Sequence, residues 1–113
     1  MSKFFHVSII WVNQIKPPDQ LRPIFDLAGD WVFYGNGNWI IYTSEDAYTW
    51  QGRIGAIIGP DDSFFLCEIA DIRSSGGWLP KWVWDWIRRD RSSFIPPISG
   101  VLPRIPPLGF FKE

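Results

Sequence analysis

Two apolar runs that flank a glycine-rich turn constrain the fold of this chain more than any other sequence feature. The runs, residues 30–34 (Asp-Trp-Val-Phe-Tyr) and residues 39–43 (Trp-Ile-Ile-Tyr-Thr), are rich in the aromatic and β-branched side chains that favour strands. Residues 35–38 (Gly-Asn-Gly-Asn) lie between them and contain the Asn-Gly pair typical of tight hairpin turns, because both residues tolerate positive φ. The sequence therefore predicts a β-hairpin over residues 30–43.

The segment before the hairpin predicts one strand and one helix. Residues 4–12 are mostly aromatic and β-branched and end before a Pro-Pro break at positions 17 and 18, which indicates a strand. Apolar residues at helical spacing follow the break, and Gly29 stands where a C-terminal cap is expected, so we predict a helix up to that glycine. Along the strand, Phe5, Val7, Ile9 and Trp11 share one face, whereas Phe4, His6, Ser8 and Ile10 share the other.

The segment after the hairpin predicts a second helix and a fourth strand. Ser44 is placed to cap a helix that carries Glu45 and Asp46 in its first turn and runs to about Ile58. Residues 63–70 are apolar and predict the strand. The order βαββαβ is the ferredoxin-like pattern, with a four-stranded antiparallel sheet and both helices on one face. We expect an α+β fold of this kind, with the first and fourth strands adjacent and central.

The C-terminal third predicts an added helix and an extended tail. Residues 78–89 indicate a short helix with Pro80 at its first position, and the side chains of Trp78, Trp82 and Trp86 are expected on one buried face. Residues 94–113 hold five prolines among apolar residues, which excludes a regular helix or a central strand. We therefore expect a domain over residues 1–93 and a proline-rich tail, 94–113, that docks on the domain or on a partner subunit.

Composition excludes several classes of protein. Hydrophobic residues make up 46% of the 113 residues and the formal net charge is -1, which excludes intrinsic disorder and allows one compact domain. Cys67 is the only cysteine, so an internal disulfide is impossible and a reducing, cytoplasmic setting is expected. The sequence contains no apolar run of the roughly 18 residues needed to span a bilayer, so we expect no association with a membrane.

Isolated residues with catalytic or metal-binding potential favour structural roles. His6 lies in a predicted core strand and is expected on its less buried face, and Cys67 is expected to pack in the core as an inert thiol. Asp61 and Asp62 follow a Gly-Pro pair, where aspartate stabilises turns through hydrogen bonds to its own backbone. We therefore assign no catalytic residue, no metal ligand and no cofactor.

A cluster of basic residues around a tryptophan-rich helix is the strongest candidate for a binding site. Residues 1–72 carry four bases and nine acids, a net charge of -5, whereas residues 73–113 carry seven bases and three acids, a net charge of +4. Arginine beside an exposed aromatic ring can hold a nucleic-acid backbone and stack on a base, although the same pattern also suits an ordinary solvated face. The candidate residues for nucleic-acid or partner binding are Arg73, Lys81, Trp84, Arg88, Arg89 and Arg91.

Three stretches resemble the SinR-like family of small proteins. They are residues 38–43 (Asn-Trp-Ile-Ile-Tyr-Thr), residues 59–66 (Gly-Pro-Asp-Asp-Ser-Phe-Phe-Leu), and residues 77–87, which contain Gly-Trp-Leu-Pro-Lys and Trp-Asp-Trp-Ile. The resemblance implies the ferredoxin-like fold shared with the CRISPR-associated adaptation nuclease subunit and VapD-type ribonucleases, and a tendency to form homodimers. The related nucleases carry a metal-binding carboxylate at the end of the first strand, where this chain has Asn13.

These observations lead to three functional hypotheses. The first is a non-catalytic, homodimeric binding module of the SinR-like, CRISPR-adaptation-related kind that contacts nucleic acid through the basic cluster. The second is a protein-interaction module of the antitoxin or immunity type, which presents aromatic surface to another protein. The third, a metal-dependent ribonuclease, rests on fold analogy alone. Apolar side chains on both faces of the sheet require a cover for the face without helices, and a dimer partner or the tail is expected to supply it.

Overall fold

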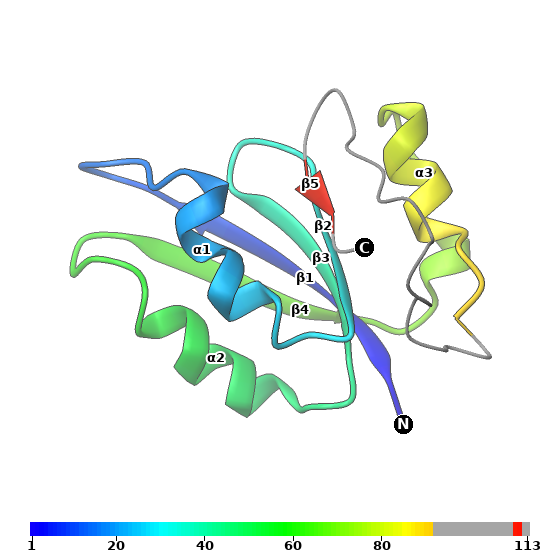
Figure 1. Ribbon diagram of the computed structural model, residues 1–113, viewed down its shortest axis with the longest axis horizontal. Helices are drawn as coiled ribbons and strands as arrows, with labels where there is room; N and C mark the ends of the chain where they lie inside the picture. Colours follow the sequence, from blue (N-terminus) through cyan, green and yellow to red (C-terminus); the bar gives the residue numbers. More distant parts are fainter. Residues whose placement is uncertain (92–109, 112–113) are drawn as a thin grey trace, which may run out of the picture.

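Strands that are far apart in the sequence meet in one antiparallel sheet. The structure, a computed structural model, describes residues 1–91 and 110–111 (Figure 1). Its strands are β1 (Lys3–Ile10), β2 (Asp30–Phe33), β3 (Asn38–Thr43), β4 (Ser63–Ile69) and β5 (Phe110–Phe111), and its helices are α1 (Pro18–Phe25), α2 (Ala47–Gly55), the 3₁₀ helix η1 (Ile72–Ser74) and α3 (Lys81–Ile87). The strand order is β4-β1-β3-β2-β5, and all neighbours are antiparallel. The predicted α+β class, the antiparallel arrangement of the four predicted strands β1 to β4 and the added third helix are confirmed, and β5 adds a fifth strand to the sheet.

The predicted hairpin is present, and its turn also contacts the strand β1. Gly35, Asn36 and Gly37 all have positive φ, and the turn is closed by hydrogen bonds between Tyr34 and Asn38 and between Asn38 and Gly35. Gly37 is buried, and its carbonyl accepts a hydrogen bond of 2.8 Å from the backbone N–H of Ile9. The turn therefore both reverses the chain and ties β1 to the hairpin.

We predict that Gly37→Ala destabilises the protein by about 2 kcal/mol or more, because strained backbone and steric overlap act together there. A Cβ at Gly37, where φ is +75°, would lie 2.2 Å from the carbonyl oxygen of Ile9. Gly35→Ala is the matched control, since its φ of +103° is also strained but a Cβ there would meet no atom within 4 Å. Denaturant unfolding of both variants measures the difference, and equal losses would show that the contact with Ile9 contributes nothing.

The helices begin and end at different residues from those predicted. α1 ends at Phe25, so Gly29 is not its cap. In α2 the N-terminal cap is Asp46 instead of Ser44, because the Asp46 carboxylate accepts a hydrogen bond of 2.9 Å from the N–H of Thr49. That hydrogen bond lowers the pKa of the Asp46 carboxyl group. Both helices are therefore shorter than the helices predicted from the spacing of apolar residues.

One face of the sheet, here called the helix face, is covered by α1 and α2 (Figure 1). Phe5, Val7 and Ile9 of β1 point to this face and are buried, as the alternation of the strand predicted. The ring of Trp39 stacks on Phe25 with centroids 3.7 Å apart and planes 1° apart. The buried set is Phe5, Val7, Ile9, Leu21, Phe25, Ala28, Trp31, Trp39, Ile41, Trp50 and Ile54.

The opposite face of the sheet has a second, smaller core formed with η1 and α3. Its buried residues are Val32, Ile40, Ile72, Val83, Trp86 and Ile87, and Phe4 packs against them. The candidates expected to cover this face were a partner subunit or the tail, but the added helix of the same chain covers part of it. The remainder of the face, around His6, Ser8 and Ile10, is only partly buried or exposed.

Three expectations about packing are wrong. Trp78 is fully exposed, because α3 begins at Lys81 and Trp78 therefore does not share its helical face; Trp82 is only partly buried. Cys67 is exposed, not in the core, because it lies opposite His6 on the part of the sheet that α3 leaves open. β4 is adjacent to β1 as expected but lies at the sheet edge, and β1 and β3 are central among the four longer strands.

Most of the predicted tail lies outside the described residues. The domain boundary at residues 93 and 94 and the docking of the segment 94–109 therefore stay predictions. The backbone of β5 is described, and it pairs with β2 so that Phe110 lies opposite Phe33 and Phe111 lies opposite Val32.

Candidate ligand-binding cavity

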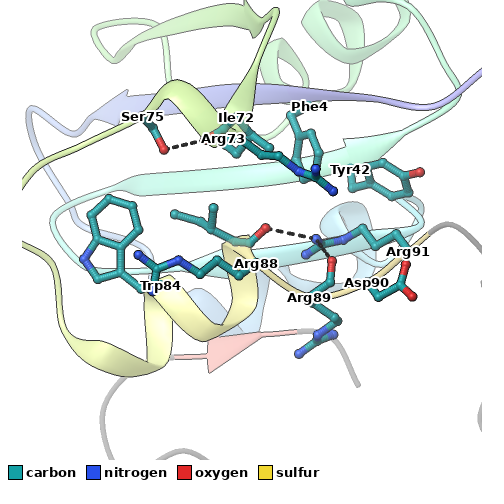
Figure 2. A pocket seen from close by; sticks show the side chains of 11 residues that line it. Phe4, Tyr42, Ile72, Arg73, Ser75, Trp84, Arg88, Arg89, Asp90 and Arg91 are labelled. Carbon is teal, nitrogen blue, oxygen red and sulfur yellow. Dashed lines mark hydrogen bonds between the residues drawn. The ribbon is translucent and has the colours of Figure 1, made fainter.

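A cavity of about 530 Å³ opens between η1, the C-terminal part of α3 and the opposite face of the sheet. Five of the six predicted binding residues line it: Arg73, Trp84, Arg88, Arg89 and Arg91. Figure 2 shows the η1 residues on one side of this space and the α3 residues on the other. We call it the arginine cavity.

The side chains of Arg73 and Arg88 supply exposed positive charge to the arginine cavity. Arg73 belongs to η1, which is capped by Asp71: its carboxylate accepts hydrogen bonds from the Ser74 hydroxyl at 2.8 Å and the Arg73 N–H at 3.0 Å. These hydrogen bonds lower the pKa of the Asp71 carboxyl group, and the hydrogen bond from Ser74 has the largest effect. Neither arginine side chain forms a salt bridge within the described part of the chain.

Arg88 and Trp84 form a stacked pair at the mouth of the cavity. They are four residues apart at the C-terminal end of α3, where side chains meet on one helical face. The Arg88 guanidinium carbon lies 5.5 Å from the centroid of the Trp84 ring, within the range of a cation–π contact. Trp84 is partly buried and Arg88 is exposed, so the pair presents a flat, charged surface to solvent.

Asp30 anchors the other two arginines. It begins β2, its side chain is only 7% exposed, and its Oδ2 accepts hydrogen bonds from Arg89 at 3.1 Å and from Arg91 at 3.2 Å. Its Oδ1 accepts from the indole N–H of Trp86 at 3.1 Å and from the backbone N–H of Trp31 at 3.0 Å. The four hydrogen bonds make Asp30 the link between the sheet and the end of α3.

Arg91 has a structural role. Its guanidinium carbon lies 4.2 Å from the ring centroid of Trp86, 5.0 Å from that of Phe4 and 5.4 Å from that of Tyr42. It also donates a hydrogen bond of 2.7 Å to the backbone carbonyl of Trp86, and its side chain is 6% exposed. Burial lowers the pKa of Arg91, and the Asp30 carboxylate opposes that shift.

Lys81 is the one predicted binding residue that does not line the cavity. It lies at the first turn of α3, away from the arginines, and donates a hydrogen bond of 2.8 Å to Asp85 four residues later. Its side chain is 88% exposed, so this is a surface ion pair. The structure therefore brings together five of the predicted residues and separates the sixth.

Sequence reasoning missed Asp30, Phe4 and Tyr42. Phe4 and Tyr42 are paired across β1 and β3, and their rings contact each other with centroids 4.8 Å apart on the cavity wall. The alternation of β1 places Phe4 on the opposite face, and the strand register adds Tyr42 and Asp30 to the same face, since Tyr42 is paired with both. Asp30 could have been noticed in the sequence as a charged residue at the start of an apolar strand. A carboxylate buried at such a place requires hydrogen-bond donors, which the arginines of the cluster can supply.

The other candidates from the sequence are structural. His6 is partly buried on the opposite face, as expected, and its Nε2 is hydrogen-bonded to the Tyr34 hydroxyl. Burial lowers the pKa of His6 and raises that of Tyr34. Asp62 accepts hydrogen bonds from the backbone N–H groups of Gly59 at 2.7 Å and Val12 at 2.8 Å, which fits the predicted turn role.

Comparison with protein-family models found no matching family, and comparisons with curated proteins and with solved structures found no match. In residues 1–91 and 110–111, no helix is long and apolar enough to cross a bilayer. The same residues contain no group of three or more His, Cys, Asp or Glu side chains placed to hold a metal ion. The functional proposal consequently rests on the geometry of the arginine cavity.

Proposed function

We propose that this protein is a non-catalytic binding module that contacts nucleic acid through the arginine cavity. The observation that carries the proposal is the convergence of Arg73 and Arg88, neither of them in a salt bridge within the described residues, on one cavity beside Trp84. Guanidinium groups bind phosphate through paired hydrogen bonds, and an adjacent indole ring offers a surface for stacking. The arrangement supplies both kinds of contact within one site.

The charge balance around the cavity favours an anionic ligand although the whole chain is slightly acidic. Four arginines and Asp90 line the cavity, and Asp30 lies behind Arg89 and Arg91. Four positive and two negative charges leave a net charge of +2 at this place, against -1 for the whole chain. A local excess of positive charge in a concave site concentrates anions there.

Arg88→Gln is expected to weaken binding of fluorescently labelled RNA and DNA oligonucleotides about tenfold, because a hydrogen bond between charged groups contributes about 1.5 kcal/mol or more. The slope of log K against log salt concentration should become less steep by about 0.7 for a single strand, since one phosphate contact is lost. Fluorescence anisotropy at several salt concentrations measures both quantities.

Lys81→Gln is the matched control for this experiment. It removes the same charge from the same helix, but outside the cavity and from a surface ion pair. We expect it to leave both affinity and salt slope close to those of the unmodified protein. Equal losses in the two variants would show that general charge, not the cavity, drives binding; absence of salt-dependent binding would overturn the proposed function.

The proposal extends to fold type and family. The order β4-β1-β3-β2, with α1 and α2 on one face, supports a ferredoxin-like fold, and the three stretches quoted above support a relationship to the SinR-like, CRISPR-adaptation-related proteins. In this setting Asn13 supports a non-catalytic role, because it is a neutral amide where the resemblance implies a metal-binding carboxylate in the related nucleases; its side chain donates a hydrogen bond of 3.3 Å to Asp61.

The proposed assembly is a homodimer formed through the β4 edge and the open part of the opposite face. β4 is paired only with β1 among the described strands, so its outer edge is available for hydrogen bonding. Phe65 of β4 is 64% exposed and Ile10 of β1 is 59% exposed, and the register places them as diagonal neighbours on this face. An exposed apolar edge of this kind favours contact with a second copy.

We expect light scattering at low micromolar concentration to give twice the mass of one chain, and Phe65→Ser to reduce it to one mass. Tyr48→Ser is the control, because Tyr48 is 83% exposed but lies on α2, away from the β4 edge. A single-chain mass for the unmodified protein would refute the homodimer. A partner of different sequence on the same surface would instead support the protein-interaction module.

A further inference from the structure

The arginine cavity differs from a simple basic patch in having aromatic walls. Phe4 and Tyr42 lie on the sheet side, and Trp84 lies on the helix side beneath the Arg88 guanidinium group (Figure 2). A basic patch needs only charge to contact the phosphates of a duplex. Aromatic rings beside the charge add a surface that only an unpaired, unstacked base can contact.

The cavity also has a size that fits one nucleotide. Its volume of about 530 Å³ falls in the range of about 300–1,000 Å³ that is typical of small-molecule sites. A base in a duplex is enclosed between its neighbours and cannot enter such a site without leaving the stack, which costs a few kcal/mol. A base in a single strand enters at lower cost, because it is already unpaired.

Building on the proposed function, we propose that the arginine cavity selects single-stranded nucleic acid by accepting one unstacked base against the Trp84–Arg88 pair. Arg73 on the η1 side and Arg88 on the α3 side attract the phosphates that flank the inserted base. Every base has a π face, so the stacking contact gives preference for single strands without a strong preference for sequence.

The experiment compares a labelled ten-nucleotide single strand with the blunt duplex of the same sequence by fluorescence anisotropy. We expect the single strand to bind at least tenfold more tightly, because stacking of one base contributes about 1–3 kcal/mol. Trp84→Leu should lower the single-strand affinity about tenfold and lower the duplex affinity much less, with little change in the salt slope, because no charge is removed. Arg88→Gln should lower the affinity for both the single strand and the duplex.

Two further variants separate stacking from folding. Trp84→Phe keeps a flat ring at the same place and should restore most of the single-strand affinity that Trp84→Leu loses. Trp78→Leu removes a tryptophan that is fully exposed and does not line the cavity, so it should bind like the unmodified protein. Circular dichroism and thermal melting of each variant show that it is folded at the temperature of the binding measurement.

The outcomes distinguish this inference from the proposed function. Equal affinities for single strand and duplex, with loss of both in Arg88→Gln, would overturn base insertion and leave nucleic-acid binding in place. Base insertion would also be overturned if Trp84→Leu bound the single strand as tightly as the unmodified protein does. Absence of salt-dependent binding to either ligand would overturn both.

Discussion

Asp30→Ala is expected to lower the free energy of unfolding by about 3–5 kcal/mol, the cost of removing one partner from a buried ion pair. The carboxylate accepts four hydrogen bonds, and the Arg91 side chain that it neutralises is 6% exposed. Without Asp30, the positive charge of Arg91 loses the carboxylate that neutralises it and remains largely buried against ring faces and backbone carbonyls. Denaturant unfolding followed by circular dichroism measures the loss.

Asp85→Ala is the matched control for Asp30→Ala. Both variants remove a carboxylate that is hydrogen-bonded to a basic side chain, but the Lys81–Asp85 pair is exposed, and such pairs contribute less than about 1 kcal/mol. Similar unfolding midpoints for the two variants would contradict the anchoring role of Asp30.

The loss of stability in Asp30→Ala should be largest in α3. α3 has seven residues, which is too short for a helix to be stable without tertiary contacts. Its amide protons should therefore exchange faster in the variant, whereas those of β1 and β3 keep their protection. Because Trp84 and Arg88 belong to α3 or follow it directly, nucleic-acid binding should be lost together with this protection.

The sequence predicted the local elements because each has a strong local signal. The hairpin required the glycines at its turn, and the alternation along β1 placed Phe5, Val7 and Ile9 together on one face, which is buried in the structure. The helix ends were less predictable, because Ser44 and Asp46 are both good caps and only the tertiary structure decides which one meets a free N–H.

Which element covers the opposite face could not be read from the sequence. The segment between β4 and α3 holds consecutive small residues, and nothing in its composition determines where it directs the helix. In the structure, Val83, Trp86 and Ile87 pack on the sheet, whereas Trp78 precedes the helix and faces solvent. A tryptophan near a helix is therefore not by itself evidence of burial.

The candidate site was predicted in part because basic residues close together in sequence often remain close in space. Charge spacing identified Arg73, Arg88, Arg89 and Arg91 but not their different roles. The roles depend on Asp30, which is about 60 residues away in the sequence from Arg89 and Arg91. Asp30 accepts hydrogen bonds from these two arginines, whereas Arg73 and Arg88 remain exposed. A contact of this range needs the sheet topology, which local patterns do not encode.

Trp39→Ala is expected to destabilise the protein by about 3–5 kcal/mol, because it removes the largest kind of side chain from the middle of the helix-face core. Trp39 is 1% exposed, and its ring stacks on Phe25 and contacts Trp31 and Phe33, with centroid distances of 3.7, 5.3 and 4.7 Å. The cavity that remains cannot be filled easily, since its neighbours are rigid rings. Denaturant unfolding measures the loss.

Trp39→Phe tests a finer point about the same side chain. The indole N–H of Trp39 is buried and has no hydrogen-bond partner among the described residues, whereas that of Trp31 donates to Asp26 at 2.8 Å. An unsatisfied buried donor costs about 1–3 kcal/mol, so removing it offsets part of the packing that the smaller ring loses. Trp39→Phe should therefore destabilise the protein less than Trp31→Phe, although both lose the same atoms. The opposite order would mean that packing around Trp39 outweighs the unsatisfied N–H.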